Sequence, residues 1–331
     1  MKNLSVLVVL IFAFGIFFSG CQNENNPVEN DLSGGNLSKK DITWYVPDNF
    51  STIQEAINSP SVLDGNTIIV GPGNFKGANV TKNVNIKGIG NTVINDGPYY
   101  GAFGYKIGFR FTTGSDGSTL SNLSFSTDFG VLSVGYATVK NVTITHCEFI
   151  NSIAAIHIRN GSGWNIQQNN IIDLRTSLAA GGIGILIWLG DALGGTVQDN
   201  VISHNTISGT LHVAPDGGNW YIGCGIALGL ENWAGFPGPI VLTKNYVTHN
   251  SISLVSDNPS QIDVVALAIS DPRYDISLGA SIFDNSIAYN DFRGTINQIL
   301  LMPEELDDHN YISRNLGDNR GHGLHPILLM P

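Results

Sequence analysis

The chain has 331 residues and a formal net charge of −11 at pH 7, because 27 Asp and Glu residues outnumber 16 Lys and Arg residues. This acidic balance argues against nucleic-acid binding, which requires a basic surface. Charged residues make up only 13% of the chain while glycine contributes 39 residues, and this composition favours short strands joined by tight turns over helices.

The first residues are typical of a secretory signal. Lys2 precedes an apolar run from Leu4 to Phe18, which is too short for a comfortable transmembrane helix. The run leads into Ser-Gly-Cys21, which resembles a bacterial lipobox, whose cysteine becomes the lipidated first residue of the mature protein. An ordinary signal peptide cut nearby is the alternative. We expect a cell-envelope protein, periplasmic or on the outer-membrane surface, held to the membrane by a lipid on Cys21.

The chain is therefore interpreted in three parts. Residues 1–20 are the signal, and residues 21–43 are a polar, flexible tether. Residues 44–331 form a single domain, because a sequence repeat runs through its second half without an intervening linker.

One short helix is predicted at residues 51–58. Either Ser51 with Gln54 or Thr52 with Glu55 has the spacing of a capping box, in which two side chains satisfy the first free backbone amides of a helix. The helix is therefore expected to begin at this point in the chain.

The predicted helix and the strand predicted at 67–70 resemble the N-terminal region of a known protein family. Residues 46–57 (Val-Pro-Asp-Asn-Phe-Ser-Thr-Ile-Gln-Glu-Ala-Ile) and 65–73 (Gly-Asn-Thr-Ile-Ile-Val-Gly-Pro-Gly) resemble the N-terminal region of right-handed parallel β-helix proteins of the pectin-lyase-like superfamily. The resemblance implies that the helix caps the open end of a coil stack, where unpaired strand edges would otherwise be exposed. It implies little about activity, because this fold hosts lyases, hydrolases, esterases and non-catalytic surface proteins.

A short sequence motif is then repeated along the chain. It consists of an aliphatic residue, two variable residues, Asn, one variable residue and usually another apolar residue, and it occurs at 166–171, 202–207, 247–252 and 287–292. A repeat of a few tens of residues indicates stacked copies of one strand–bend–strand unit. We expect the Asn to occupy the bend in the left-handed conformation, and to bond to its counterparts in the copies above and below.

The repeat predicts an all-β parallel β-helix of roughly ten coils, and the resemblance implies that it is right-handed and that its N-terminal helix is a cap. Cys147 takes the Asn place of an earlier copy of the repeat. It lies too many coils from Cys224 for a disulfide, so we expect two buried free thiols.

Three coils are longer than the others, because they carry inserted segments around residues 174–196, 208–240 and 253–281. These long coils contain candidate acidic residues. Asp191, Glu231 and Asp271 follow one another at intervals of 40 residues, each just after an apolar strand. Carboxylates on adjacent coils would lie about 5 Å apart. At that distance they raise one another's pKa, which suits acid–base catalysis, or they share a Ca²⁺ ion. The alternative is three solvated acids in turns.

The resemblance also suggests a reaction. β-Helix lyases often use Lys or Arg as the base that removes the proton next to the uronate carboxylate, with a cation stabilising the resulting anion. Arg273 is the preferred base here, beside Glu231 and Asp271, whereas Lys244 and Arg159 are the other basic candidates. Each of these could instead form a structural ion pair.

Candidate substrate-binding residues come from two patterns. His204 and His249 share a place one residue before the repeated Asn, where they could contact a sugar hydroxyl or a metal, or be ordinary turn residues. Trp188, Trp220 and Trp233 lie in or beside the inserted segments, where they could stack on sugar rings or cover the core.

These patterns favour a protein that binds or processes polysaccharide, and a Ca²⁺-assisted polysaccharide lyase is the most concrete form of that hypothesis. A non-catalytic surface protein that binds a glycan or another partner is the alternative, and the scarcity of basic residues favours it. A third hypothesis is a metal-handling periplasmic protein, and only the histidines support it.

Overall fold

The computed structural model of the protein describes residues 42–101, 104–134, 136–177, 182–189, 195–215, 223–230, 240–271 and 281–322. Residues 41–331 form one compact unit. The predicted signal, most of the tether and Cys21 lie outside the described residues. Within these ranges, no helix has both the length and the apolar character needed to cross a membrane.

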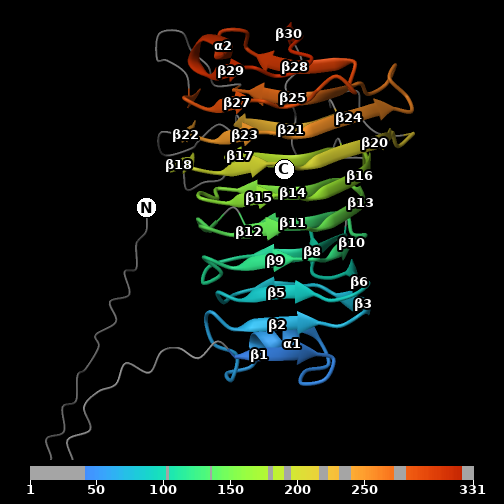
Figure 1. Ribbon diagram of the computed structural model, residues 1–331, viewed down its shortest axis with the longest axis vertical. Coiled ribbons are helices and arrows are strands. Elements are labelled where there is room, and N and C mark those ends of the chain that lie inside the picture. The colour runs from blue at the N-terminus through green and yellow to red at the C-terminus, as the bar shows by residue number, and fades with distance from the viewer. Residues whose placement is uncertain are drawn as a thin grey trace, which may run out of the picture. The chain divides into compact units, whose positions relative to one another are not determined.

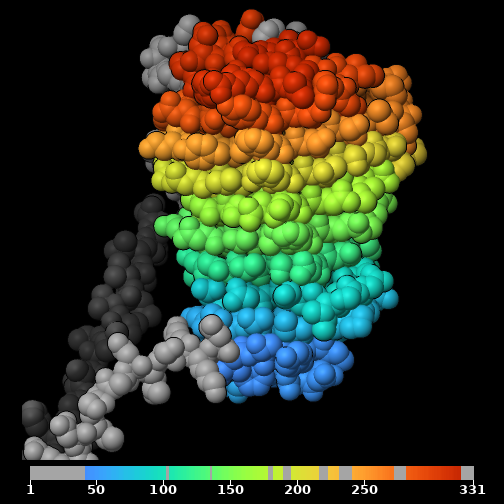
Figure 2. Space-filling model, viewed as in Figure 1, coloured from blue at the N-terminus to red at the C-terminus, as the bar shows by residue number. Residues whose placement is uncertain are grey.

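The compact unit is a parallel β-helix, as predicted (Figure 1). The chain visits three sheets in turn, A, B and C, before it returns one coil further along, so neighbouring strands in each sheet are distant in sequence. Figure 2 shows the coils as successive bands of colour. Sheet A has ten strands among the described residues: β1 (Thr43–Val46), β2 (Thr67–Val70), β5 (Asn85–Gly88), β9 (Thr119–Ser121), β12 (Thr143–Thr145), β15 (Asn165–Gln167), β19 (Val201–Ser203), β23 (Tyr246–Thr248), β27 (Ser286–Ala288) and β29 (Tyr311–Ser313).

The other sheets follow the same order. Sheet B contains β3 (Gly73–Lys76), β6 (Thr92–Asp96), β10 (Ser124–Phe125), β13 (Glu148–Ser152), β16 (Asn170–Arg175), β20 (Thr206–His212) and β24 (Ser251–Ser256). Sheet C contains β4 (Ala78–Val80), β8 (Tyr105–Phe111), β11 (Phe129–Ser133), β14 (Ala154–Arg159), β17 (Ile183–Leu189), β21 (Gly223–Leu230), β25 (Val264–Ser270), β28 (Asn297–Met302) and β30 (Arg320–His322), and β7 (Tyr99–Tyr100) pairs antiparallel with β8.

The inward side chains stack in aliphatic columns. In sheet A, Ile144, Ile166, Ile202, Val247 and Ile287 are in register on successive strands, and all are buried. Burial of each such side chain contributes about 1.5–3 kcal/mol relative to exposure. Because strand side chains alternate between the two faces, this inward column fixes which residues point outward.

The predicted capping helix is present as α1 (Ile53–Asn58). Thr52, the N-cap, accepts a hydrogen bond from the Glu55 backbone amide at 3.0 Å, as in a capping box. The Glu55 carboxylate accepts in return from the backbone amide of Ser51, one residue before the N-cap, at 3.0 Å. Buried residues of α1 join the main core beside β1, β2 and β4. A second helix, α2 (Leu306–His309), was not predicted.

The repeated asparagines form a buried ladder. The Oδ1 atom of Asn250 accepts from both the backbone amide and the side-chain amide of Asn205, each at 3.0 Å, and the pattern repeats from Asn169 to Asn315. The expectation that Asn itself adopts the left-handed conformation was wrong: the residue before it does, as in His204 at φ 57°. The Asn side chain must point inward to reach the next coil, so the preceding residue makes the bend.

A second ladder runs beside the first. Asn200, Asn245, Asn285 and Asn310 are linked in the same way, with side-chain bonds of 2.8–2.9 Å between neighbours. The asparagines of this second ladder stand at the turn just before each strand of sheet A. The asparagines of the predicted ladder stand at the turn just after each strand. Each strand of sheet A in this region is therefore held at both ends.

The long coils return through a small additional sheet. Strands β18 (Gly195–Gln198), β22 (Ile240–Thr243) and β26 (Ile282–Phe283) pair in parallel just before sheet A resumes. The three insertions therefore rejoin the coil at equivalent positions. Much of each insertion, including the segments that contain Asp191, Glu231 and Arg273, lies outside the described residues.

Both predicted thiols are free and buried. Burial raises the pKa of the Cys147 thiol to about 12. Its backbone amide donates to Asn169 Oδ1 at 3.0 Å, so Cys147 occupies the end of the predicted ladder. Cys147 therefore donates to the ladder through its backbone amide alone, because a thiol has no side-chain amide to donate the second bond of the pair.

We expect Asn250→Ala to lower the free energy of unfolding by about 3 kcal/mol, because two buried donors of Asn205 lose their acceptor. Urea unfolding followed by circular dichroism measures the change. Ile296→Ala is the control, since this side chain is 82% exposed and its removal should change stability by less than about 0.5 kcal/mol. Equal stability of Asn250→Ala and the parent would contradict a structural role for the ladder.

Candidate glycan-binding surface

The structure brings the two predicted histidines together. The rings of His204 and His249 are stacked with centroids 5.0 Å apart and planes 3° apart, and Tyr289 continues the stack 5.2 Å beyond His249. The Arg314 guanidinium lies 5.3 Å from the centre of the Tyr289 ring and also bonds to its hydroxyl. All four side chains are exposed.

Strand register explains this column. Ser203, Thr248, Ala288 and Ser313 are Cα partners at the ends of four successive strands of sheet A. The residue after each of them has a positive φ, between 55° and 60°, and so leaves the sheet in the same direction. Parallel strands about 4.8 Å apart therefore place four planar groups one above another.

Stacking determines what the column can contact. The faces of the two imidazole rings lie against neighbouring planar groups, so the ring edges are the parts available to a ligand. His249 Nδ1 lies 2.7 Å from the Thr248 hydroxyl, which leaves its Nε2 atom available for another hydrogen bond. The column thus presents polar ring edges at regular intervals along the stack.

Exposed tyrosines lie beside this column on the outward face of sheet A. Tyr246 and Tyr311 are 45% and 57% exposed and each precedes an inward aliphatic residue, while Tyr289 is 47% exposed. Several large exposed aromatics on one face are informative, because such side chains usually bury most of their area. We call His204, Tyr246, His249, Tyr289 and Tyr311 the tyrosine–histidine surface.

Sequence reasoning found only the histidines of this surface. A signal for two of the tyrosines was present, because Tyr246 and Tyr311 both stand four residues before a ladder asparagine. Their register through Ser286 places them on the same outward column, two coils apart.

The predicted tryptophans do not join this surface as far as the structure describes them. Trp188 is 2% exposed and packs with Leu186, Cys224 and Met302 in a second apolar cluster on the outward side of sheet C. In this conformation its ring covers other apolar side chains and has no free face. Trp220 and Trp233 lie outside the described residues, so their predicted role in substrate binding stays a prediction.

Of the three residues in the predicted acidic column, only Asp271 lies within the described ranges. Asp271 follows β25 and is 1% exposed, and its Oδ2 atom accepts a hydrogen bond from the Ser281 backbone amide at 3.0 Å. Asp191, Glu231 and Arg273 are outside the described residues. Within the described ranges, no group of three or more His, Cys, Asp or Glu residues is arranged to hold a metal ion. The catalytic and Ca²⁺-binding roles stay predictions.

The other basic candidates are placed apart. Arg159 is 9% exposed in β14 and donates to the Tyr100 hydroxyl at 2.7 Å, whereas Lys244 is exposed at a left-handed turn position before sheet A. They lie in different parts of the coil and do not form one site together.

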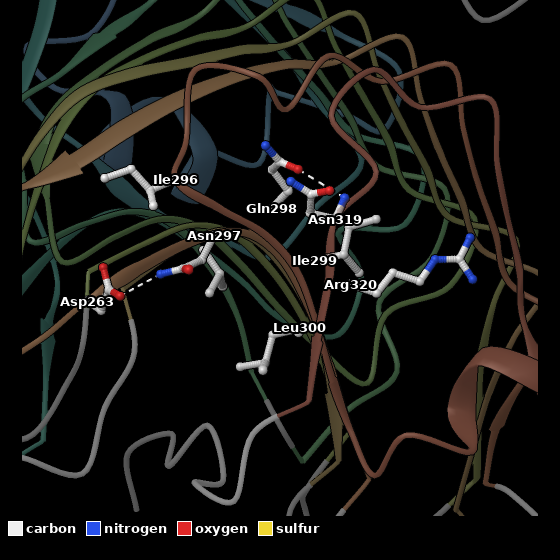
Figure 3. Close-up of a pocket in the computed structure, with 10 residues that line it drawn as sticks. Asp263, Ile296, Asn297, Gln298, Ile299, Leu300, Asn319 and Arg320 are labelled. Carbon is white, nitrogen blue, oxygen red and sulfur yellow. Dashed lines mark hydrogen bonds between the residues drawn. The ribbon is translucent and has the colours of Figure 1, made fainter.

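A pocket of about 460 Å³ lies between β25, β28 and β30 (Figure 3). Its polar residues bond to one another: Asn297 donates to Asp263, and Gln298 accepts from the Asn319 backbone amide at 2.9 Å. Leu300 lies on its apolar side. The pocket suits a small polar ligand, but it lacks the repetition along the stack that distinguishes the tyrosine–histidine surface.

An imidazole with one buried nitrogen lies on sheet C. The Nε2 atom of His157 in β14 has no accessible surface and no hydrogen-bond partner. Burial, and then the positive charge of Arg159, hold the pKa of His157 well below its usual value. His157 is therefore neutral at physiological pH.

We expect the protein to lose stability as the pH falls below about 6.5, the pKa of an unfolded histidine, because the unfolded chain binds a proton that native His157 excludes. One such group contributes a slope of up to about 1.4 kcal/mol per pH unit. Urea unfolding at pH 7.5 and 5.5 measures it, and His157→Gln should show the smaller loss. Leu132→Ala, in the neighbouring strand, should lower stability equally at both pH values. An unchanged pH slope in His157→Gln would contradict this assignment.

Comparisons with known proteins are consistent with this geometry. Residues 76–266 match the model of a family described as "Right handed beta helix region". A cell surface glycoprotein of Methanothermus fervidus is 31% identical over 163 residues, which are 42% of this chain and 26% of that protein. The chain thus spans about a quarter of the length of this relative.

Among solved structures, the catalytic domain of a GH87 α-1,3-glucanase in complex with nigerose has 12% sequence identity and a TM-score of 0.30, over 77% of this chain and 63% of that one. A complex of a variant of that domain with tetrasaccharides has 11% identity and a TM-score of 0.31, over the same shares. Likeness at this level carries no argument about function. The family match covers more than half of the sequence, and the chain therefore belongs to the right-handed β-helix family.

Proposed function

We propose that this protein is a polysaccharide-binding β-helix of the cell envelope, and that the tyrosine–histidine surface contacts the glycan. The observation that carries the proposal is the alignment of three exposed tyrosines with two stacked histidines over four successive coils of sheet A.

The chemistry of these side chains suits a sugar chain. A tyrosine ring offers apolar area to the C–H face of a sugar at a low cost in conformational entropy, and its hydroxyl can bond to a sugar hydroxyl. The free edge of an imidazole donates or accepts a hydrogen bond in the same way. Neither kind of contact requires a charge on the ligand, so this surface does not require a charged glycan.

The repetition favours a polymer over a small ligand. Each coil presents its contact about 4.8 Å further along the stack, so a linear chain that follows the stack meets similar groups several times. Contacts that are individually weak then add through a high effective concentration.

The proposed location rests on two further observations. The N-terminal residues are typical of a secretory signal that is followed by Cys21, and the Methanothermus relative is named a cell surface glycoprotein. A lipid on Cys21 would hold the β-helix at the membrane while the tether, residues 21–43, lets it reach a glycan.

A Ca²⁺-assisted polysaccharide lyase is the alternative. It requires Asp191, Glu231 and Asp271 around a cation, with Arg273 as the base. Asp271 is almost fully buried, and one of its oxygens already accepts a backbone hydrogen bond. This placement favours a structural role for Asp271, so non-catalytic binding is the preferred form of the proposal.

We expect the triple variant Tyr246→Ala, Tyr289→Ala, Tyr311→Ala of the full chain to bind its polysaccharide at least about tenfold more weakly, since each aromatic contact contributes about 0.5–1.5 kcal/mol. Affinity electrophoresis through gels that contain neutral or acidic polysaccharides measures the retardation. Tyr45→Ala is a matched control, because Tyr45 lies on sheet A at the opposite end of the stack and is 46% exposed, against 47% for Tyr289. Undiminished binding by the triple variant, or equal loss in the control, would place the glycan elsewhere.

The lyase alternative has a separate test. Incubation of the full chain with acidic polysaccharides, with and without Ca²⁺, should give no rise in the absorbance of unsaturated uronate if the protein only binds. A Ca²⁺-dependent rise that disappears in Arg273→Ala would instead establish the lyase.

A further inference from the structure

Two polar side chains without partners share one outward column of sheet C. Arg110 in β8, Leu132 in β11 and His157 in β14 are Cα partners on three successive strands. Their neighbours Phe109, Phe111, Ile156 and Ile158 point into the core. Arg110 and His157 therefore project from the same face, with Cα atoms about 10 Å apart across the two strand spacings.

Both side chains contain a buried nitrogen that makes no hydrogen bond. The Nε atom of Arg110 and the Nε2 atom of His157 are inaccessible to solvent and lack a partner, although each residue as a whole is partly exposed. A buried donor that loses its water without gaining an acceptor costs about 1–3 kcal/mol, and more when it is charged. Such atoms in a folded protein call for an explanation, and an absent bound ion or water is a common one.

Arg110 also lacks a counter-charge. Several other cations of the described residues are paired with carboxylates: Arg175 with Asp128, Arg293 with Asp291, Arg320 with Asp307, and Lys76 with Asp96 at 2.9 Å. No described carboxylate lies within ion-pair distance of Arg110 in a chain whose acidic residues outnumber its basic ones 27 to 16. Among the described residues, the partly buried guanidinium of Arg110 is therefore not neutralised by a carboxylate.

The surroundings favour an anion. Leu132 and Phe129 beside these groups are buried, and the ring of Phe129 lies 6.3 Å from that of His157. Apolar neighbours lower the local dielectric constant and so strengthen a charge-assisted hydrogen bond. Arg159, two residues after His157 on the same face, adds a second positive charge.

We propose that Arg110 and His157 form a binding site for an oxyanion, a carboxylate or a sulfate group, on the outward face of sheet C. The guanidinium supplies the charge and a fork of donors, and the neutral imidazole supplies a further N–H from Nε2. The anionic group belongs either to an acidic glycan or to a free small anion. The site lies on a different sheet from the tyrosine–histidine surface and does not depend on it.

The test measures thermal unfolding of the full chain at constant ionic strength, with sodium sulfate or sodium glucuronate in place of sodium chloride and with glucose as the uncharged control. We expect sulfate or glucuronate to raise the unfolding temperature above its value in chloride, and glucose to leave it unchanged. Titration calorimetry with the same salts should show at least tenfold weaker binding in Arg110→Gln. Arg293→Gln, which removes an exposed and paired guanidinium, should bind as the parent does.

Three further variants make the result decisive. Arg110→Lys keeps the charge and loses the fork, so it should bind with intermediate affinity even if Arg110→Gln fails to fold. His157→Gln should weaken binding less than Arg110→Gln. Tyr289→Ala should keep the full response, which separates this site from the proposed glycan surface.

A final comparison identifies the source of the anion. Tighter binding of a uronate or sulfated polysaccharide than of the free anion, lost in Arg110→Gln, shows that the site recognises a glycan substituent. Binding of sulfate alone shows a site for a free anion. No anion-specific stabilisation of the parent, or an equal response in Arg110→Gln, would overturn the proposal and assign the two nitrogens to bound water.

Discussion

The coils are held in register by one interaction, the acceptance of two hydrogen bonds by the side-chain oxygen of a buried asparagine. Asn205 Oδ1 takes both bonds from Asn169, and Asn205 gives both of its own to Asn250. The bonds satisfy polar groups that would be costly to leave unpaired in the interior. A slip of one residue would break every rung and turn the aliphatic column outward, so a single register is strongly favoured.

This constraint organises the outside of the molecule as well as the core. Once strands are in register, the chemical character of a face depends on what stands at one position of successive coils. On sheet A, that position brings tyrosine and histidine to the surface. On sheet C, the outward positions are apolar and buried around Trp188, and basic around Arg110 and His157. Three surfaces of different chemistry thus arise from one repeated backbone.

The sequence predicted those features that repeat or that depend on neighbours in the chain. The capping box of α1 is local, and the aliphatic and asparagine positions recur, so both were found. The second ladder was missed although Asn200 and Asn245 each precede a predicted ladder residue by five positions. The conformation of the bend was assigned to Asn when the preceding residue adopts it, because the pattern gives the spacing and not the direction of the side chain.

The tyrosine–histidine surface was less predictable for a physical reason. Exposed positions recur less regularly than the inward aliphatic residues, so Tyr246 and Tyr311 share a spacing to a ladder asparagine but form no continuous repeat. Tyr289 stands out only once the coils are stacked. The burial of Trp188 and Asp271 depends on packing between segments distant in sequence, which spacing alone does not report. The histidines were found because they adjoin a residue that does repeat.

The rungs of the two ladders are interchangeable. Asn205 presents to the coil before it the same atoms that Asn250 presents to Asn205, and the long insertions rejoin the coil at equivalent points beside β18, β22 and β26. A coil duplicated or deleted as a whole would meet the same bonding pattern at both of its joints. Evolution can therefore change the length of this protein in steps of one coil, and change its loops independently, without inventing a new core.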